Sequence, residues 1–92
     1  MDGELTVRQA SAVAGQVLYG QAVIIVPARG ETLILNESAT VLWSMMEAQV
    51  GVEELAAHLQ ARYGLSAGRA LADTRALLDA LHAAGAVDGW SA

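Results

Sequence analysis

The sequence predicts an α+β domain in which a three-stranded antiparallel sheet is followed by three helices. Residues 16–35 contain two runs that are rich in Val, Ile, Leu and Tyr, a composition typical of strands. From residue 41 onward, apolar residues recur at helical spacing instead. Strands followed by helices indicate helices packed on one face of a small sheet. The 92 residues are enough for one modest core, so we expect a single domain over residues 1–92.

The expected strands form a meander. Residues 1–12 have no clear period, and we interpret them as an arm or a loose first strand. We expect the strands at residues 16–19, 22–26 and 32–35, with Gly20-Gln21 turning the first strand back on the second.

The second turn is predicted from Pro27-Ala28-Arg29-Gly30. Proline presets φ for the first corner of a type I turn, and Gly30 supplies the positive φ that often follows it. A hairpin should therefore pair residues 22–26 with residues 32–35.

The first helix is expected to begin after Asn36, whose short polar side chain can accept the free amides of a first turn. The apolar period continues to about Gln49, and Gly51 ends it. A second helix fits Val52–Tyr63, with Gly64 as its stop.

The third helix should begin after the cap Ser66 and end before Gly85, which makes it the longest. One stripe of this helix carries Leu71, Thr74, Leu78 and Leu81, and a short extended tail over residues 86–90 follows the helix.

Composition excludes several classes of function. Five Arg, no Lys and ten acidic residues give a formal charge of -5, which would repel a phosphate backbone, so we expect no nucleic-acid partner. There is no cysteine for a disulfide, a thiolate nucleophile or a thiolate metal site. Without a signal-like start or a long apolar run, we expect a soluble cytoplasmic protein with no membrane partner.

The sequence contains no recognisable arrangement of catalytic residues. His58 and His82 lack a second ligand at metal-binding spacing, and the consecutive carboxylates Glu53-Glu54 suit a helix start better than acid–base work. No serine lies in a nucleophile-elbow pattern. We therefore predict a binding protein and not an enzyme, with no catalytic residue, metal or cofactor.

Two further features have alternative interpretations. The segment Trp43-Ser44-Met45-Met46 fits an adaptable peptide-binding patch, although its helical spacing favours plain core. Arg75, Asp79 and His82 form a polar stripe at i, i+4 and i+7, which is either a solvated face or a recognition face.

Residues 16–88 resemble the PqqD family. The resemblance begins in residues 27–39, where a strand ending in Leu35-Asn36 precedes a small-residue helix start, and it includes the pair Leu42-Trp43. It continues, in the same order as in the family, through Val52-Glu53-Glu54-Leu55, Ala61-Arg62-Tyr63-Gly64, Ala72-Asp73, Leu77-Leu78-Asp79-Ala80-Leu81 and Ala84-Gly85-Ala86-Val87.

The resemblance implies a winged-helix-like recognition element for ribosomally synthesised, post-translationally modified peptides. Such domains are non-catalytic: they bind the leader of a precursor peptide and present the precursor to a processing enzyme. The leader would add as a strand to the third strand of the meander, in the cleft beside the third helix. Carried onto this chain, the peptide-binding residues are Glu31, Thr32, Leu33 and Ile34 on the strand, and Leu71, Arg75, Leu78, Asp79 and His82 on the helix.

The sequence leaves alternatives open for the partner enzyme and for the function of the domain. The processing enzyme is either a separate cysteine leader peptidase of the lasso-peptide type, which we favour, or a radical SAM maturase served by a PqqD-type chaperone. The overlapping architecture also fits a winged-helix DNA-binding regulator. The same strand edge could instead serve an obligate dimer, although we expect a monomer or weak dimer.

Overall fold

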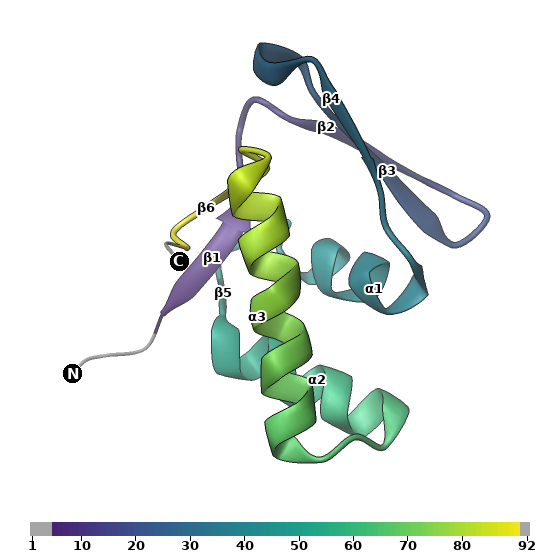
Figure 1. The fold of residues 1–92 in the computed structure, drawn as a ribbon, viewed down its shortest axis with the longest axis vertical. Helices are drawn as coiled ribbons and strands as arrows, with labels where there is room; N and C mark the ends of the chain where they lie inside the picture. The colour runs from purple at the N-terminus through teal and green to yellow at the C-terminus, as the bar shows by residue number, and fades with distance from the viewer. Residues whose placement is uncertain (1–4, 91–92) are drawn as a thin grey trace.

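A computed structural model describes residues 5–90 as two small antiparallel sheets and three helices, which confirms the predicted α+β class. The sheets have the strand orders β2-β3-β4 and β5-β1-β6. Figure 1 shows the two sheets on opposite sides of α3. In chain order the elements are β1 (Thr6–Gln9), β2 (Ala14–Leu18), β3 (Gln21–Val26), the 3-10 turn η1 (Pro27–Arg29), β4 (Glu31–Ile34), α1 (Glu37–Met45), β5 (Val50–Gly51), α2 (Val52–Tyr63), α3 (Ala67–Ala83) and β6 (Val87–Asp88).

The β2-β3-β4 sheet is the predicted meander, with its first turn one residue earlier than expected. Leu18 pairs with Gln21, so Tyr19 and Gly20 occupy the turn, with φ of 54° and 79°. Positive φ at both central positions is the type I′ pattern, whose twist matches that of a two-residue hairpin. The prediction of a Gly20-Gln21 turn is wrong because the glycine takes the second central position.

The second turn forms as predicted. η1 begins at Pro27, and Gly30 is left-handed with φ 64° while its N–H donates to the Pro27 carbonyl. Proline and glycine thus make a stiff connection between β3 and β4.

Helix α1 begins where the sequence predicts and ends earlier. The Asn36 side chain accepts from the Ala39 N–H, which is an N-cap. The predicted end at about Gln49 is wrong, because α1 stops at Met45 and Val50–Gly51 form β5 against β1. Helices α2 and α3 have the predicted starts, and Gly64 is the left-handed stop of α2.

The N-terminal segment contains a strand, so of its two interpretations, arm or first strand, the second is confirmed for residues 6–9. Residues 6–9 form the central strand of the β5-β1-β6 sheet, and Val7 is almost fully buried there. The Gln9 side chain also donates to the Trp43 carbonyl at 2.9 Å. Residues 1–4 of the predicted arm lie outside the described part of the chain.

The core lies where the three helices meet the inner faces of the two sheets. Trp43 and Met46 are buried in it, so their interpretation as core is confirmed. Other large buried members are Ile24, Leu42, Leu55, Leu78 and Leu81. Between residues 5 and 90, no helix has the length and apolar character needed to cross a membrane.

Candidate functional site at the open edge of β4

One edge of β4 has unused backbone hydrogen-bonding groups. β4 pairs only with β3 among residues 5–90. The Leu35 N–H donates to the Ala22 carbonyl, and bonded and non-bonded pairs alternate along an antiparallel ladder. Glu31 and Leu33 therefore direct their N–H and C=O groups to β3. Thr32 and Ile34 direct theirs to the open edge.

Side chains of β4 alternate between two faces of the sheet. Leu33 pairs with the fully buried Ile24 and packs against the core. Ile34 pairs with Val23 on the opposite face, where its side chain is 68% exposed. An extended peptide added at this edge would therefore direct alternate side chains to the two faces of the sheet.

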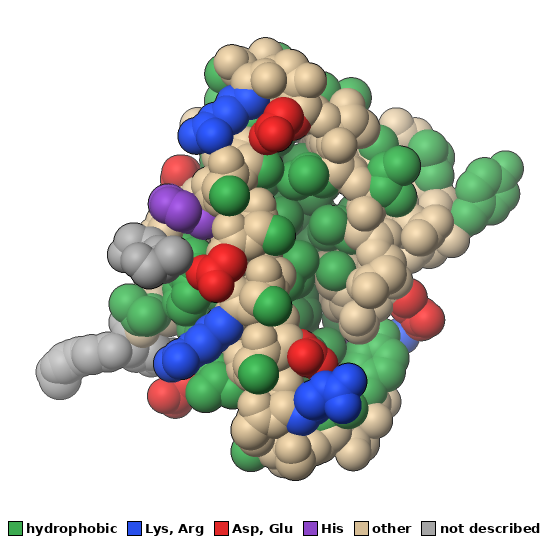
Figure 2. Space-filling model, in the orientation of Figure 1, with side chains coloured by type: hydrophobic (Ala, Val, Ile, Leu, Met, Phe, Trp, Pro, Cys, Tyr) green, Lys and Arg blue, Asp and Glu red, His purple; other side chains and the backbone are tan. Residues whose placement is uncertain are grey.

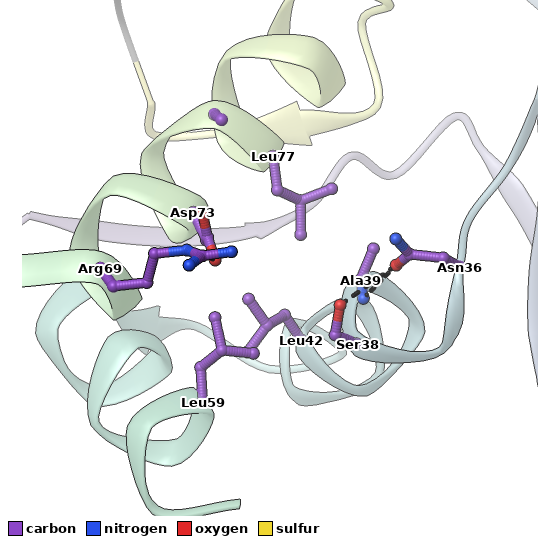
Figure 3. Close-up of a pocket in the computed structure, with 9 residues that line it drawn as sticks. Asn36, Ser38, Ala39, Leu42, Leu59, Arg69, Asp73 and Leu77 are labelled. Carbon is purple, nitrogen blue, oxygen red and sulfur yellow. Dashed lines mark hydrogen bonds and ion pairs between the residues drawn. The ribbon is translucent and has the colours of Figure 1, made fainter. Parts of the chain in front are cut away.

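A cavity of about 530 Å³ opens where β4 ends and α1 begins, between α1, α2 and α3. We call it the α1–α3 cavity. Leu42, Leu59 and Leu77 converge on it in Figure 3. It is also lined by Asn36, Ser38, Ala39, Arg69, Asp73 and Ala76. An adjoining cavity of about 360 Å³ adds Glu37, Tyr63 and Leu65.

The α1–α3 cavity has an apolar floor and a polar rim. On the α3 side, Arg69 Nε lies 3.3 Å from Asp73 Oδ2 in an exposed ion pair. On the α1 side, the Ser38 hydroxyl donates to Asn36 Oδ1 at 3.2 Å. Figure 2 shows hydrophobic side chains in the hollow between α3 and β4. Such a mixture suits an apolar side chain whose backbone stays near polar groups.

The helix residues expected at the site do not line this cavity. Leu78 is fully buried in the core and Leu71 is half-buried against it. Arg75 and Asp79 each lie two residues from Leu77, which places them about 160° around the helix from it. His82 lies about 140° around from Leu77 on the same reasoning.

The rotation of α3 decides which of its residues face the cavity. Asp79 is occupied elsewhere, because its Oδ1 accepts from Trp90 Nε1 at 2.8 Å. The helix wall of the cavity consists of Arg69, Asp73, Ala76 and Leu77. The polar stripe of Arg75, Asp79 and His82 lies on a flank of α3 turned away from this cavity, whereas the small Ala76 lies beside Leu77 on the cavity side.

A second exposed surface lies on the face of the β2-β3-β4 sheet that is turned away from the core. Strand pairing puts Ala14, Leu18, Val23, Ile25 and Ile34 on this side, which we call the outer face. Leu18 and Ile25 are 45% and 47% exposed. Their neighbours on the same face, Gln16, Gln21 and Thr32, carry no charge. The outer face is thus an exposed patch of apolar and neutral side chains.

Between residues 5 and 90 no three His, Asp or Glu side chains gather closely enough to hold a metal ion. The features that the structure shows at this site are the open strand edge of β4 and the α1–α3 cavity.

The family model for coenzyme PQQ synthesis protein D (PqqD) matches residues 21–87, from β3 through β6. This chain belongs to the PqqD family. The match includes β4, η1 and every residue that lines the α1–α3 cavity. Membership agrees with the prediction of a binding protein and not an enzyme.

Among solved structures, the chain is similar to TbiB1, whose structure is described as a complex with the TbiA(beta) leader peptide. The two superpose with a TM-score of 0.85 at 21% identity, over 92% of this chain and 99% of TbiB1. The PqqD-family fold is therefore shared along almost the whole length. Comparison with the curated proteins gives no match.

Proposed function

We propose that this PqqD-family protein binds the leader of a ribosomally synthesised precursor peptide as an added strand on β4. The observation that carries the proposal is the open edge at Thr32 and Ile34, which ends beside the α1–α3 cavity. The TbiB1 complex supports it, since a protein of the same fold is described with a leader peptide bound.

Backbone pairing would supply register and part of the affinity. The N–H and C=O groups of Thr32 and Ile34 can each pair with an extended peptide without disturbing the β3 ladder. A peptide that continues past Ile34 reaches the α1–α3 cavity, where Leu77 and Leu42 accept an apolar side chain. Specificity would then come from the cavity and from the residues that face it.

Charge favours a basic leader. The chain carries a formal charge of -5, and Glu31, Glu37 and Asp73 lie along the proposed path of the peptide. Arg69 is paired with Asp73 and Arg62 with Glu37, so the preference for a basic leader rests on the net negative charge of the whole chain. A leader that carries Lys or Arg would be steered to this side.

The bound leader would be delivered to a separate processing enzyme in the cytoplasm. We favour a cysteine leader peptidase of the lasso-peptide type, with a radical SAM maturase as the alternative. The outer face is the surface available for that enzyme, because it is apolar, uncharged and next to the β4 edge. An enzyme docked there would also contact those leader side chains that lie beside Ile34.

The proposal is tested by fluorescence anisotropy with labelled leaders from short precursor genes beside the gene for this chain. Ile34→Pro removes an N–H that points to the open edge of β4, and we expect at least tenfold weaker binding. Val17→Pro is the matched control, because pairing of Leu18 with Gln21 leaves the Val17 N–H on the opposite open edge, that of β2. Equal losses in both variants, or no leader bound by the wild type, would contradict the proposal.

A further inference from the structure

The last turn of α3 leaves one carbonyl that the chain satisfies from a distant loop. Gly85, with φ 80°, follows the helix, and its N–H donates to the His82 carbonyl at 3.0 Å. The Ala86 N–H donates to the Leu81 carbonyl at 2.8 Å, which completes a Schellman motif. Neither bond uses the Ala83 carbonyl. Arg29 Nη1 donates to that oxygen at 2.7 Å.

The Arg29 guanidinium is seated closely on the end of the helix. Its Nε lies 3.1 Å from the position that a Cβ on Gly85 would occupy. Gly85 is thus required for two reasons, its positive φ and the space that Arg29 fills. A cation over the last carbonyls also suits the negative end of the helix macrodipole.

This contact joins the meander sheet to α3. Between residues 5 and 90, no other hydrogen bond connects the segment from β2 through β4 with α3. Arg29 stands at the end of η1, two residues before β4 begins, and the turn is stiffened by Pro27 and Gly30. Other contacts hold the opposite end of β4. The Leu35 N–H donates to the Ala22 carbonyl, and the Asn36 side chain caps α1.

We propose that Arg29 is a positioning residue for the peptide site. It fixes the start of β4 against the end of α3, and so sets the distance between the β4 edge and α3, between which the leader lies. The inference rests on the proposed function, since the spacing matters only if a peptide occupies it. Arg29 need not touch the peptide. It holds the strand edge and the helix wall in one relative position before binding, which lowers the ordering cost of association.

The test compares two ways of breaking the same contact. Arg29→Gln removes the charge and shortens the reach, whereas Gly85→Ala puts a methyl group where the guanidinium lies. Each should weaken leader binding about tenfold, and the double variant should be no weaker than either single one, because both act through one contact. Arg29→Lys should recover part of the affinity, since lysine can still donate to the Ala83 carbonyl.

Matched controls separate this effect from charge and backbone strain. Arg8→Gln removes a charge from the exposed side of β1. Gly64→Ala puts the same strain at the left-handed end of α2, where nothing lies within 4 Å of the added Cβ. Both controls should bind leader within about twofold of the wild type. Additive losses for Arg29→Gln and Gly85→Ala, or wild-type affinity in Arg29→Gln, would overturn the proposal.

A second measurement needs no leader. In the unbound protein, amide hydrogen exchange at Glu31 and Leu33 should be faster in Arg29→Gln than in Arg8→Gln, because the start of β4 loses its anchor. Unchanged exchange would overturn the anchoring role even if the wild type binds leader normally. If the wild type binds no leader while exchange rises, the proposed function fails and the anchor itself stands.

Discussion

The Ala22 N–H donates to the Thr40 hydroxyl at 2.8 Å inside the core, so one buried side chain holds β3 against α1. The same hydroxyl lies 3.4 Å from the Leu35 carbonyl, to which it donates. Thr40 is 7% exposed. It therefore links β3, the end of β4 and α1, and fixes the sheet that carries the open edge onto the helices.

Replacing Thr40 tests this link. Thr40→Val keeps the volume but leaves the Ala22 N–H buried without a partner, which should lower the free energy of unfolding by about 1–3 kcal/mol. Thr40→Ser keeps the hydroxyl and should cost less. Urea unfolding of the three proteins measures the difference, and equal stability of the valine and serine variants would show that the bond contributes nothing.

The two flanks of α3 can be compared directly with a pair of leucines. Leu77 and Leu71 are both half-buried against the core, but only Leu77 lines the α1–α3 cavity. Leu77→Ala should weaken leader binding about tenfold because it removes part of the apolar floor. Leu71→Ala should affect mainly stability. Calorimetric titration with leader checks this, and a greater loss of affinity in Leu71→Ala would return the site to the opposite flank.

The outer face should act in processing and not in leader binding. Ile25→Glu puts a charge at the centre of this face, 47% exposed in the wild type, so the fold should tolerate it. We expect leader affinity within about twofold of the wild type and leader removal slowed about tenfold or more, since a buried charge disrupts an apolar interface. Leu5→Glu is the control, because Leu5 is 53% exposed and lies outside the outer face. Rates of enzymatic processing with saturating leader measure the effect, and an unslowed Ile25→Glu reaction would exclude this face.

Much of the fold was predictable because local signals agreed with the final packing. Asn36 and Ser66 accept amides in the first turns of their helices, as expected of short polar caps. Gly64 and Gly30 adopt the left-handed conformations for which glycine is favoured. These are interactions within a few residues, which the sequence displays directly.

The second sheet was missed because its evidence is not local. β1 has four residues and β5 only two, too few for a period to stand out. Their pairing joins Val7 to Val50 across the chain, so long-range contacts decide the structure. The same limit explains the early end of α1, where pairing with β1 overrides a helical pattern.

The open edge of β4 can be predicted from sequence, whereas the α3 residues that line the α1–α3 cavity cannot. Thr32 and Ile34 follow from the alternation of an edge strand once the hairpin register is known. The rotation of α3 about its own axis depends on which of its faces packs into the core. The buried face contains Ala70, Thr74, Leu78 and Leu81. The concave flank is therefore next to Leu77, on the opposite side of that face from Arg75.

The measurement that tests the central claim most directly is amide hydrogen exchange with and without leader. We predict that the amides of Thr32 and Ile34 become protected on binding, because a new strand accepts their hydrogen bonds, while Gly15 and Val17 on the β2 edge stay unchanged. Leader binding without protection of Thr32 and Ile34, or with protection of the β2 edge instead, would contradict strand addition at β4.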